Sequence, residues 1–421
     1  MEKYDLIIVG AGITGLSTAY HILDENRDMK IKIVERAPTF AQGNTAKSDA
    51  AFRDIFTSDI NYKLSSSSIN FYKHIQEDLK FNLGMKFNGY LFLLDKKNME
   101  SETVKQITQK TESILIERED ISRMGFKTSI SQEISSVMNL KNIAGGLLGK
   151  NCGILEPDLI SSFYESELRK MGAEFSYNTT VRKLSLEPVL KLDFPGEPFI
   201  WQEKTIGHLE TNRGDMFADN YLLATDVWTN YLLDPIGIDS HIRPKKRQVF
   251  QVTGKGIRDM VMKDYTGEPG LFPFTILPGP MIDMRPDPRS ESFWISFNDD
   301  IGRDFSLEDD PVPEMDFYEK NLLTVIREYL PIFNESKVNS SWAGYYSMNT
   351  IDGTYYIFKE LNVGVITGSS GSGIMKGDAA GRIAAAMMLG NKKARLYGGK
   401  EIDVDDLGIK KRNVQMENLI I

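Results

Sequence analysis

The sequence predicts a mixed α/β fold in which a discontinuous nucleotide-binding domain encloses a second, antiparallel-sheet domain. Three observations predict it. Residues 1–36 run through strand, glycine turn, helix and strand, and residues 363–390 repeat strand, glycine loop and helix near the other end of the chain. Between these units, short apolar runs alternate with Pro- and Gly-rich turns, as is typical of antiparallel strands. The central part is therefore expected to be an insertion.

The composition sets limits on size and partners. The chain has 421 residues, of which 41% are hydrophobic and 26% charged, enough for two domains. A net charge of −9 argues against nucleic acid as a partner. No apolar run is long enough to span a bilayer, and the first residues lack a secretory signal. A cytoplasmic location is expected, with peripheral membrane association left open.

Disulfide and metal chemistry are not expected. Cys152 is the one cysteine in the sequence, so it has no partner for an internal disulfide. The four histidines are scattered without the spacing of metal ligands.

The opening unit carries a dinucleotide-binding pattern. Residues 4–9 (YDLIIV) form an apolar run typical of a buried parallel strand, and a GAGITG turn and a helical pattern follow. Gly10 permits the tight turn, Gly12 lets the backbone approach a pyrophosphate, and Gly15 lets helix and strand pack closely. The second strand, residues 30–34, ends in Glu35, which suits ribose hydroxyls. The predicted contacts are Gly10, Gly12, Ile13, Thr14, Gly15, Glu35 and Arg36.

A polar loop at residues 43–48 favours FAD over NAD. It offers hydroxyls and backbone donors for a second approach to the pyrophosphate, although such a loop can also be merely solvated. The predicted contacts here are Thr45, Ala46, Lys47 and Ser48.

The C-terminal unit supplies a second helix start. Strand 363–367 leads into the glycine loop 368–373 and then into an alanine-rich helix. A helix N-terminus stabilises negative charge, and reduced flavin carries such charge near N1 and the C2 carbonyl. The alternative is a connection that serves packing alone. The predicted contacts are Gly371, Ser372, Gly373, Ile374, Met375 and Lys376, together with Val181, Ala224, Thr225, Trp228 and Gly344.

The rest of the chain is less regular. Residues 60–125 have an amphipathic helical pattern, and strand-like runs occur at 199–201, 221–224, 249–252 and 293–297. Residues 267–288 are dense in Pro and Gly and predict loops and edge strands. We predict a discontinuous Rossmann-like FAD-binding domain at 1–80, 150–235 and 331–421, and a substrate-binding domain at 81–149 and 236–330.

Several of these segments together resemble the D-amino acid oxidase family of FAD enzymes, which includes sarcosine-, glycine- and dimethylglycine-oxidising members. The resemblance rests on the opening fingerprint, residues 43–53 (GNTAKSDAAFR), residues 342–346 with Asp352-Gly353, and residues 368–382 (GSSGSGIMKGDAAGR). Within the family it is strongest to archaeal dye-linked L-proline dehydrogenases, through segments 243–247, 396–399, 406–408 and 419–421.

The resemblance implies two residues that hold a substrate carboxylate. An Arg ten residues after the glycine of the phosphate-side loop grips the carboxylate in this family, and Arg53 stands in that place. Lys376 matches the assisting Lys by type. It lies one residue later than in sarcosine oxidase-like members, which leaves the flavin pyrimidine ring as its alternative contact.

Three departures from the family pattern refine the expectation. The chain has Tyr345-Tyr346-Ser347-Met348 where sarcosine oxidases attach FAD through a Cys, so FAD is expected to be noncovalent. Tyr346 stands where glycine and D-amino acid oxidases carry a carboxylate-binding Arg. The oxygen-activating lysine of sarcosine oxidases would fall at Met284-Arg285, where only Arg285 offers a partial replacement for its charge. Asp226 ends a strand motif that is often ATG in flavoproteins, and we do not expect it to contact the cofactor.

The resemblance implies hydride transfer from a carbon next to an amine nitrogen to flavin N5. The predicted substrate is L-proline, oxidised to a pyrroline carboxylate, with electrons passed to an acceptor other than oxygen. Arg53, Lys376, Tyr346 and Arg285 are the candidate catalytic residues. The alternatives are oxidation of sarcosine, another N-methyl amino acid or a D-amino acid, a non-catalytic flavin-binding subunit, and an NAD-linked dehydrogenase. The electron acceptor and the oligomeric state stay open.

Overall fold

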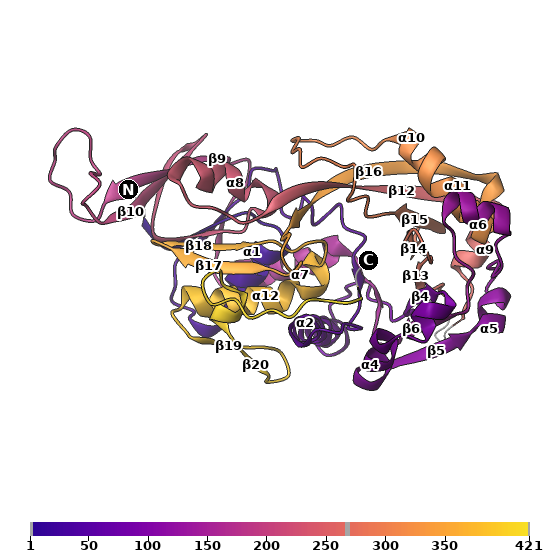
Figure 1. Cartoon of the computed structure of the whole chain (residues 1–421). Helices are drawn as coiled ribbons and strands as arrows, with labels where there is room; N and C mark the ends of the chain where they lie inside the picture. Colours follow the sequence, from indigo (N-terminus) through magenta and orange to yellow (C-terminus); the bar gives the residue numbers. More distant parts are fainter. Residues whose placement is uncertain (1–2, 266–269, 420–421) are drawn as a thin grey trace.

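The computed structural model describes residues 3–265 and 270–419, and within them the strands form two large sheets at opposite ends of an elongated molecule (Figure 1). The predicted α/β class is confirmed. The last two residues of the segment 419–421 and residues 267–269 of the Pro/Gly-rich stretch lie outside the described residues.

The first sheet has eight strands in the order β17-β18-β11-β1-β2-β8, and β10 and β9 extend it from β11. Its core from β18 to β8 is parallel, as the apolar opening strand predicts. The strands are β1 (Lys3–Val9), β2 (Ile31–Val34), β8 (Glu174–Ser176), β9 (Val181–Pro188), β10 (Lys204–Thr211), β11 (Gly214–Leu223), β17 (Tyr356–Glu360) and β18 (Val363–Thr367). The first and last predicted units thus belong to one sheet, in which only β11 lies between β1 and β18.

Helices α1 (Ile13–Glu25), α7 (Pro157–Lys170) and α12 (Gly373–Met388) pack with this sheet around one apolar core. The small residues of α12 allow a close approach to α1: a Cβ on Gly381 would lie 2.3 Å from Ser17 Oγ. The buried Asp378 carboxylate ties the three helices together, 2.6 Å from His21 Nε2 and 2.9 Å from the Tyr164 hydroxyl. The helix starts at residues 13 and 373 are therefore fixed relative to each other.

The second sheet also has eight strands, in the order β16-β12-β15-β14-β13-β4-β6-β5, and all pairs are antiparallel except β4 with β13. Its strands are β4 (Tyr90–Leu94), β5 (Ser113–Glu117), β6 (Gly145–Gly149), β12 (Arg243–Gly254), β13 (Phe274–Ile276), β14 (Asp283–Asp287), β15 (Ser292–Ser296) and β16 (Ser336–Met348). It carries its own apolar core. Two small ladders join β3 (Ala51–Phe52) to β7 (Gly153–Ile154) and β19 (Lys393–Arg395) to β20 (Glu401–Asp403).

The remaining helices are mostly short. They are α2 (Asp59–Glu77), α3 (Lys96–Met99), α4 (Glu102–Lys110), α5 (Arg118–Arg123), α6 (Gln132–Met138), α8 (Thr229–Leu233), α9 (Ile257–Val261), α10 (Met315–Phe317) and α11 (Leu323–Tyr329). Short 3₁₀ helices span Asp226–Trp228, Asp234–Ile236, Pro331–Glu335 and Val404–Leu407, and a π-helical turn spans Tyr318–Leu322. Among the described helices, none has the length and apolar character needed to cross a membrane.

Two predictions of secondary structure are wrong. The helical pattern at 60–125 contains β4 and β5, because Tyr90–Leu94 is a fully buried apolar run that fits a sheet centre better than an amphipathic helix. Residues 199–201 form no strand; they lie at the tip between β9 and β10, where Ile200 is 96% exposed. The runs at 221–224, 249–252 and 293–297 fall in β11, β12 and β15, with the final residue of the first and last just beyond the strand.

We propose the two-domain division predicted from the sequence, with one strand that crosses its last boundary. Strand β16, which that division assigns to the FAD-binding domain, pairs with β12 of the second sheet along its whole length. The chain therefore crosses back to the first sheet after Met348, and the β16 end lies where the two sheets meet.

Candidate active site

A cavity of about 1130 Å³ lies where the two sheets meet. Its wall includes the β1–α1 turn, the loop at 41–49, the β18–α12 loop and residues of β4, β12, β14, β15 and β16. Most predicted cofactor residues line it, namely Gly10, Gly12, Ile13, Thr14, Glu35, Arg36, Thr45, Lys47, Ser48, Val181, Ala224, Thr225, Trp228, Gly344, Gly371, Ser372, Gly373, Ile374, Met375 and Lys376. Gly15 and Ala46 are not on this wall.

The first helix start is shaped by close backbone contacts. Gly10 has φ +106°, and a Cβ there would lie 2.4 Å from the Ala224 carbonyl oxygen. A Cβ on Gly15 would lie 2.0 Å from the Gly10 oxygen, so this position needs glycine for the packing of the turn. Gly15 therefore shapes the turn without facing the cavity. Gly12, the N-cap of α1, makes no side-chain hydrogen bond, and the Ile13 N–H donates to the Thr45 hydroxyl at 3.2 Å; the other N–H groups of the first turn can serve a ligand.

Glu35 is held in place by the chain itself. Its carboxylate accepts hydrogen bonds from the backbone N–H groups of Ala11 and Ala37, both at 2.9 Å. Beside it, the Arg36 guanidinium lies 4.1 Å from the Trp228 ring centre. These contacts hold the Glu35 carboxylate and the stacked Arg36 and Trp228 side chains at the same end of the cavity.

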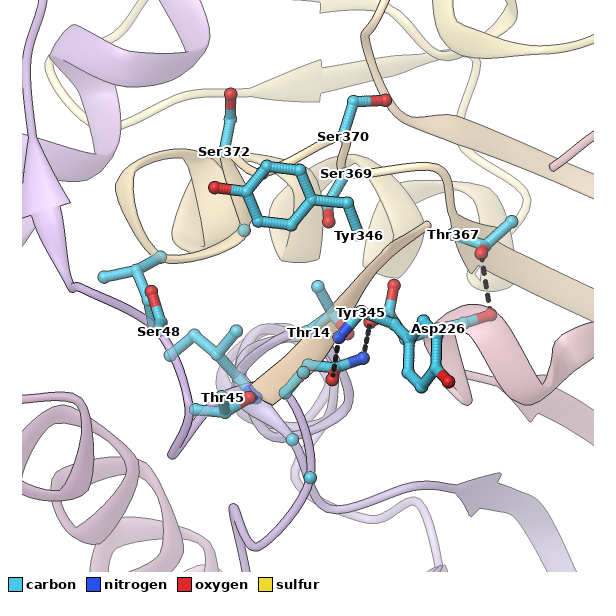
Figure 2. Close-up of a pocket in the computed structure, with 18 of the residues that line it drawn as sticks. Thr14, Thr45, Ser48, Asp226, Tyr345, Tyr346, Thr367, Ser369, Ser370 and Ser372 are labelled. Carbon is cyan, nitrogen blue, oxygen red and sulfur yellow. Dashed lines mark hydrogen bonds between the residues drawn. The ribbon is translucent and has the colours of Figure 1, made fainter. Parts of the chain in front are cut away.

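The loop at 43–48 is anchored by Asp226, which sequence reasoning discounted. Asp226 lines the cavity, and its carboxylate accepts hydrogen bonds from Asn44 at 2.7 Å and from the Ser347 hydroxyl. Its backbone oxygen accepts the Thr367 hydroxyl at 3.0 Å, as Figure 2 shows. Asp226 has φ +49°, a conformation that Asp and Asn adopt more readily than other non-glycine residues. This residue thus takes the place of the usual glycine and adds a link between the loop, β16 and β18.

The second helix start is formed by the loop at 368–373. Ser372 caps α12 without a side-chain hydrogen bond, so this N-terminus is also left to a ligand. Gly371 has φ +88°, and a Cβ there would lie 2.4 Å from the Tyr346 ring. In Figure 2 the Tyr346 ring lies beside this loop and its hydroxyl points away from Thr367. Burial raises the pKa of the Tyr346 hydroxyl, so it stays protonated and can donate a hydrogen bond.

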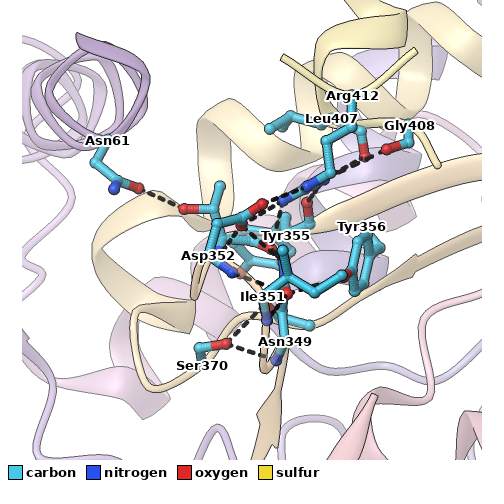
Figure 3. A network of polar contacts seen from close by, with 12 residues as sticks. Asn61, Asn349, Ile351, Asp352, Tyr355, Tyr356, Ser370, Leu407, Gly408 and Arg412 are labelled. Carbon is cyan, nitrogen blue, oxygen red and sulfur yellow. Dashed lines mark hydrogen bonds and ion pairs between the residues drawn. The ribbon is translucent and has the colours of Figure 1, made fainter. Parts of the chain in front are cut away.

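A polar network closes the cavity behind this loop (Figure 3). The Asn349 side chain donates to Asp352 at 2.8 Å and to the Thr354 oxygen at 2.6 Å. Arg412 binds the Asp352 carboxylate through two hydrogen bonds of 2.6 and 2.7 Å. The C-terminal segment is thereby fastened to the turn that follows β16.

Two buried cations share one aromatic ring in the cavity. Arg53 is 6% exposed and Lys376 is 2% exposed. The Arg53 guanidinium carbon and Lys376 Nζ lie 4.5 and 4.7 Å from the centre of the Phe56 ring. Lys376 Nζ donates to Asn61 at 2.8 Å, and Arg53 Nη1 is buried without a hydrogen-bond partner. Neither side chain is paired with a carboxylate at ion-pair distance among the described residues, so the pair forms a ready receptor for an anion.

The C-terminal segment covers this receptor. Met416, Glu417 and Leu419 line the cavity, and the Leu419 carbonyl accepts a 3.4 Å hydrogen bond from Arg53 Nη2. Glu417 is held by the backbone N–H groups of Thr57 and Ser58 at 2.9 and 3.1 Å.

Arg285 is not where a catalytic group should be. It is fully buried but does not line the cavity; it lies 3.5 Å from Glu156, 3.7 Å from Asp287 and 4.0 Å from the Trp294 ring centre. These carboxylates and the indole hold the Arg285 side chain away from the cavity wall. Its predicted role as a replacement for an oxygen-activating lysine therefore has no support in its position.

The cavity suits the expected cofactor. Two uncapped helix starts open into one space, and glycines at 10, 12 and 371 leave room where side chains would crowd it. Within the described part of the chain, no group of three His, Cys, Asp or Glu side chains could hold a metal ion. The donors present are those that bind a dinucleotide and an organic anion.

Lys376 makes anion binding depend on pH. Burial, aided by the neighbouring Arg53 charge, lowers the Lys376 pKa to about 7. Affinity for benzoate should therefore fall as pH rises through 7, by up to about tenfold per pH unit, until only Arg53 attracts the anion. Lys376→Met should bind benzoate weakly and lose this dependence. Calorimetric titration checks both; a pH-independent wild type would contradict the assignment.

Comparison with known proteins agrees with these features. Residues 5–387 match the family model described as FAD dependent oxidoreductase. The chain is 25% identical over 424 residues to FAD-dependent oxidoreductase domain-containing protein 1 of Xenopus laevis, covering 92% of this chain and 79% of that protein. It is 23% identical to glycine oxidase of Bacillus licheniformis, covering 93% and 94%. The structure of L-proline dehydrogenase from P. horikoshii superposes with a TM-score of 0.74 at 20% identity, covering 97% of both chains.

Proposed function

Because the chain belongs to the FAD-dependent oxidoreductase family, whose members the sequence already resembled, we propose that it oxidises a carboxylated secondary amine, with L-proline as substrate and a pyrroline carboxylate as product. The enzyme uses FAD, and its substrates belong to the amino acids and amines that such oxidoreductases oxidise. Electrons pass to an acceptor other than oxygen.

One observation carries the proposal: Arg53 and Lys376, two buried basic side chains without an ion-pair partner among the described residues, lie in the same cavity as the two helix starts. Dinucleotide binding alone does not require it. A carboxylate held by Arg53 through two parallel hydrogen bonds would be fixed in orientation as well as position. The relatives named for glycine and proline oxidation act on molecules that carry such a carboxylate next to an amine.

The cofactor contacts follow from the residues on the wall. The N-terminus of α1 and the Thr45 side chain would meet the pyrophosphate, and Glu35 would accept hydrogen bonds from a ribose. The N-terminus of α12 would face the negatively charged edge of the flavin. Bound FAD supplies the hydride acceptor.

The protein side of the reaction is positioning and exclusion of water. Arg53 and Lys376 hold the carboxylate, Tyr90 and Phe274, whose rings stack at 4.4 Å, wall the substrate, and the C-terminal segment covers it. The Tyr346 hydroxyl is a donor on a ring that lies against Gly371, just before the α12 start. No step calls for a protein nucleophile.

A panel of amines tests the proposal. Anaerobic bleaching of the flavin is measured with L-proline, sarcosine, glycine, dimethylglycine and D-amino acids, followed by turnover with a dye acceptor beside oxygen. L-proline should bleach the flavin fastest, with turnover faster on the dye than on oxygen. Faster bleaching by sarcosine or a D-amino acid would show that this compound, and not L-proline, is the substrate. No bleaching by any amine would overturn the proposal.

A further inference from the structure

The cavity wall also carries two carboxyl groups that share one hydroxyl. Asp49, from the phosphate-side loop, and Asp283, from β14, both line the cavity. The Ser296 hydroxyl lies 3.2 Å from Asp49 Oδ2 and in hydrogen-bond contact with Asp283 Oδ1. A hydroxyl has one hydrogen and can donate to one of these oxygens at a time, while Asp49 Oδ1 is buried without any partner. Ionising both carboxyl groups would leave two negative charges around one hydroxyl hydrogen, so the pair favours holding one proton.

In the described part of the chain, the cations that act on this pair are engaged with other carboxylates. Arg285 is the positive charge that lowers the pKa of Asp49, but its guanidinium is engaged with Glu156 and Asp287. Arg247 acts on Asp283, but it is bound to Asp300. Burial consequently raises the pKa of Asp49 to about 7 and that of Asp283 to about 6.

Other groups face the pair from neighbouring strands. The hydroxyls of Tyr346 and Tyr90 lie within reach of its charge, and burial raises the pKa of both, so neither competes for a proton near neutral pH. Tyr90 also responds to the charge of Arg53. The cavity thus has a positive end and a negative end with an aromatic side chain between them, and the unpartnered Arg53 Nη1 points to an anionic ligand in the same space.

We propose that the Asp49–Asp283 pair accepts the ammonium proton of the substrate, an inference that rests on the function proposed above. An amino acid enters with a carboxylate and a protonated amine. One proton passes from the nitrogen to the pair; a hydride then leaves the adjacent carbon for FAD, and the nitrogen lone pair completes the C=N bond. The pair returns its proton to solvent between turnovers. Asp49, with the free oxygen, is the group that takes the proton.

The test compares wild type with Asp49→Asn in anaerobic stopped-flow flavin reduction by saturating L-proline, or sarcosine if the panel selects it, between about pH 5.5 and 9.5. The wild-type rate should rise through pH 6–7 and then level. In Asp49→Asn that rise should vanish, the rate at pH 7 should fall on the order of 100-fold, and rate should climb only where the free amine loses its proton. Lys376→Met is the control for the other group that titrates near 7, and it should keep the wild-type rise.

Thermal melting of the holoenzyme gives a readout independent of turnover. A carboxyl whose pKa is raised on folding destabilises the fold increasingly from about pH 4 to 7 and by a constant amount above. The melting temperature of Asp49→Asn minus that of wild type should therefore grow over this range and then level. Asp283→Asn should show the same trend if Asp49→Asn loses its flavin.

The outcomes separate the two claims. Bleaching with an unchanged pH rise in both Asn variants, or a melting difference that does not vary with pH, overturns the proton-acceptor role and leaves the amine oxidation standing. The absence of bleaching by any amine overturns both.

Discussion

Replacing Arg53 with alanine should raise the KM for a carboxylated amine by about 100- to 4000-fold. Removing one partner of a buried, hydrogen-bonded ion pair costs about 3–5 kcal/mol, and about 1.4 kcal/mol corresponds to a factor of ten. The flavin absorption spectrum should not change, because Arg53 sits over Phe56 and beneath Leu419 rather than at either helix start. Steady-state kinetics with a dye acceptor, beside a spectrum of each variant, measures the effect.

Two variants make this result specific. Arg53→Lys keeps the charge but loses the two-pronged geometry, and it should recover only part of the affinity. Arg213→Ala removes an exposed arginine at the β10–β11 turn and should leave KM unchanged. An unaltered KM in Arg53→Ala would remove this residue from the substrate site.

Replacing Gly12 with alanine should weaken FAD binding by 100-fold or more while leaving the apoprotein folded. In the unliganded protein a Cβ on Gly12 meets only Thr45 Oγ1, at 3.2 Å, which a side-chain rotation relieves. With FAD bound, the same methyl group would stand between the α1 N-terminus and the pyrophosphate. The apoprotein melting temperature should stay within a few degrees of wild type, and titration with FAD should report the loss of affinity.

Gly10→Ala provides the contrast. Its Cβ would meet the Ala224 carbonyl at 2.4 Å with φ at +106°, so the strand and turn themselves must shift. This variant should melt well below wild type before any FAD is added. If Gly12→Ala melts as low as Gly10→Ala, or binds FAD normally, Gly12 does not approach the cofactor.

The sequence predicted the features whose signals are local. One βαβ unit contains the apolar run at 4–9, the glycine turn and the terminal Glu35. The loop at 368–373 is followed immediately by its helix, so its pattern is equally local. The family, FAD and the mixed fold were recognisable for the same reason. Placing Arg53 and Lys376 on one cavity wall depended on the resemblance, because over three hundred residues separate them.

Other features depend on contacts that no local pattern encodes. Asp49 and Asp283 look like ordinary polar positions until β14 and the phosphate-side loop bring them to Ser296. Arg285 was expected at the site because the resemblance places the oxygen-activating lysine of sarcosine oxidases at Met284-Arg285, but its side chain contacts Glu156, Asp287 and Trp294 instead.

The insertion of β18 beside β11 has a consequence for biogenesis. The parallel core of the first sheet is incomplete until residues 363–367 have left the ribosome, although β1 is made first. A nascent chain can therefore hold the nucleotide at only one end until β18 and the start of α12 have been made, so stable uptake of FAD has to follow the synthesis of these segments. Because a ligand that binds only the native state shifts the balance toward folding, scarcity of flavin in the cell should shorten the lifetime of finished chains more than it slows their production.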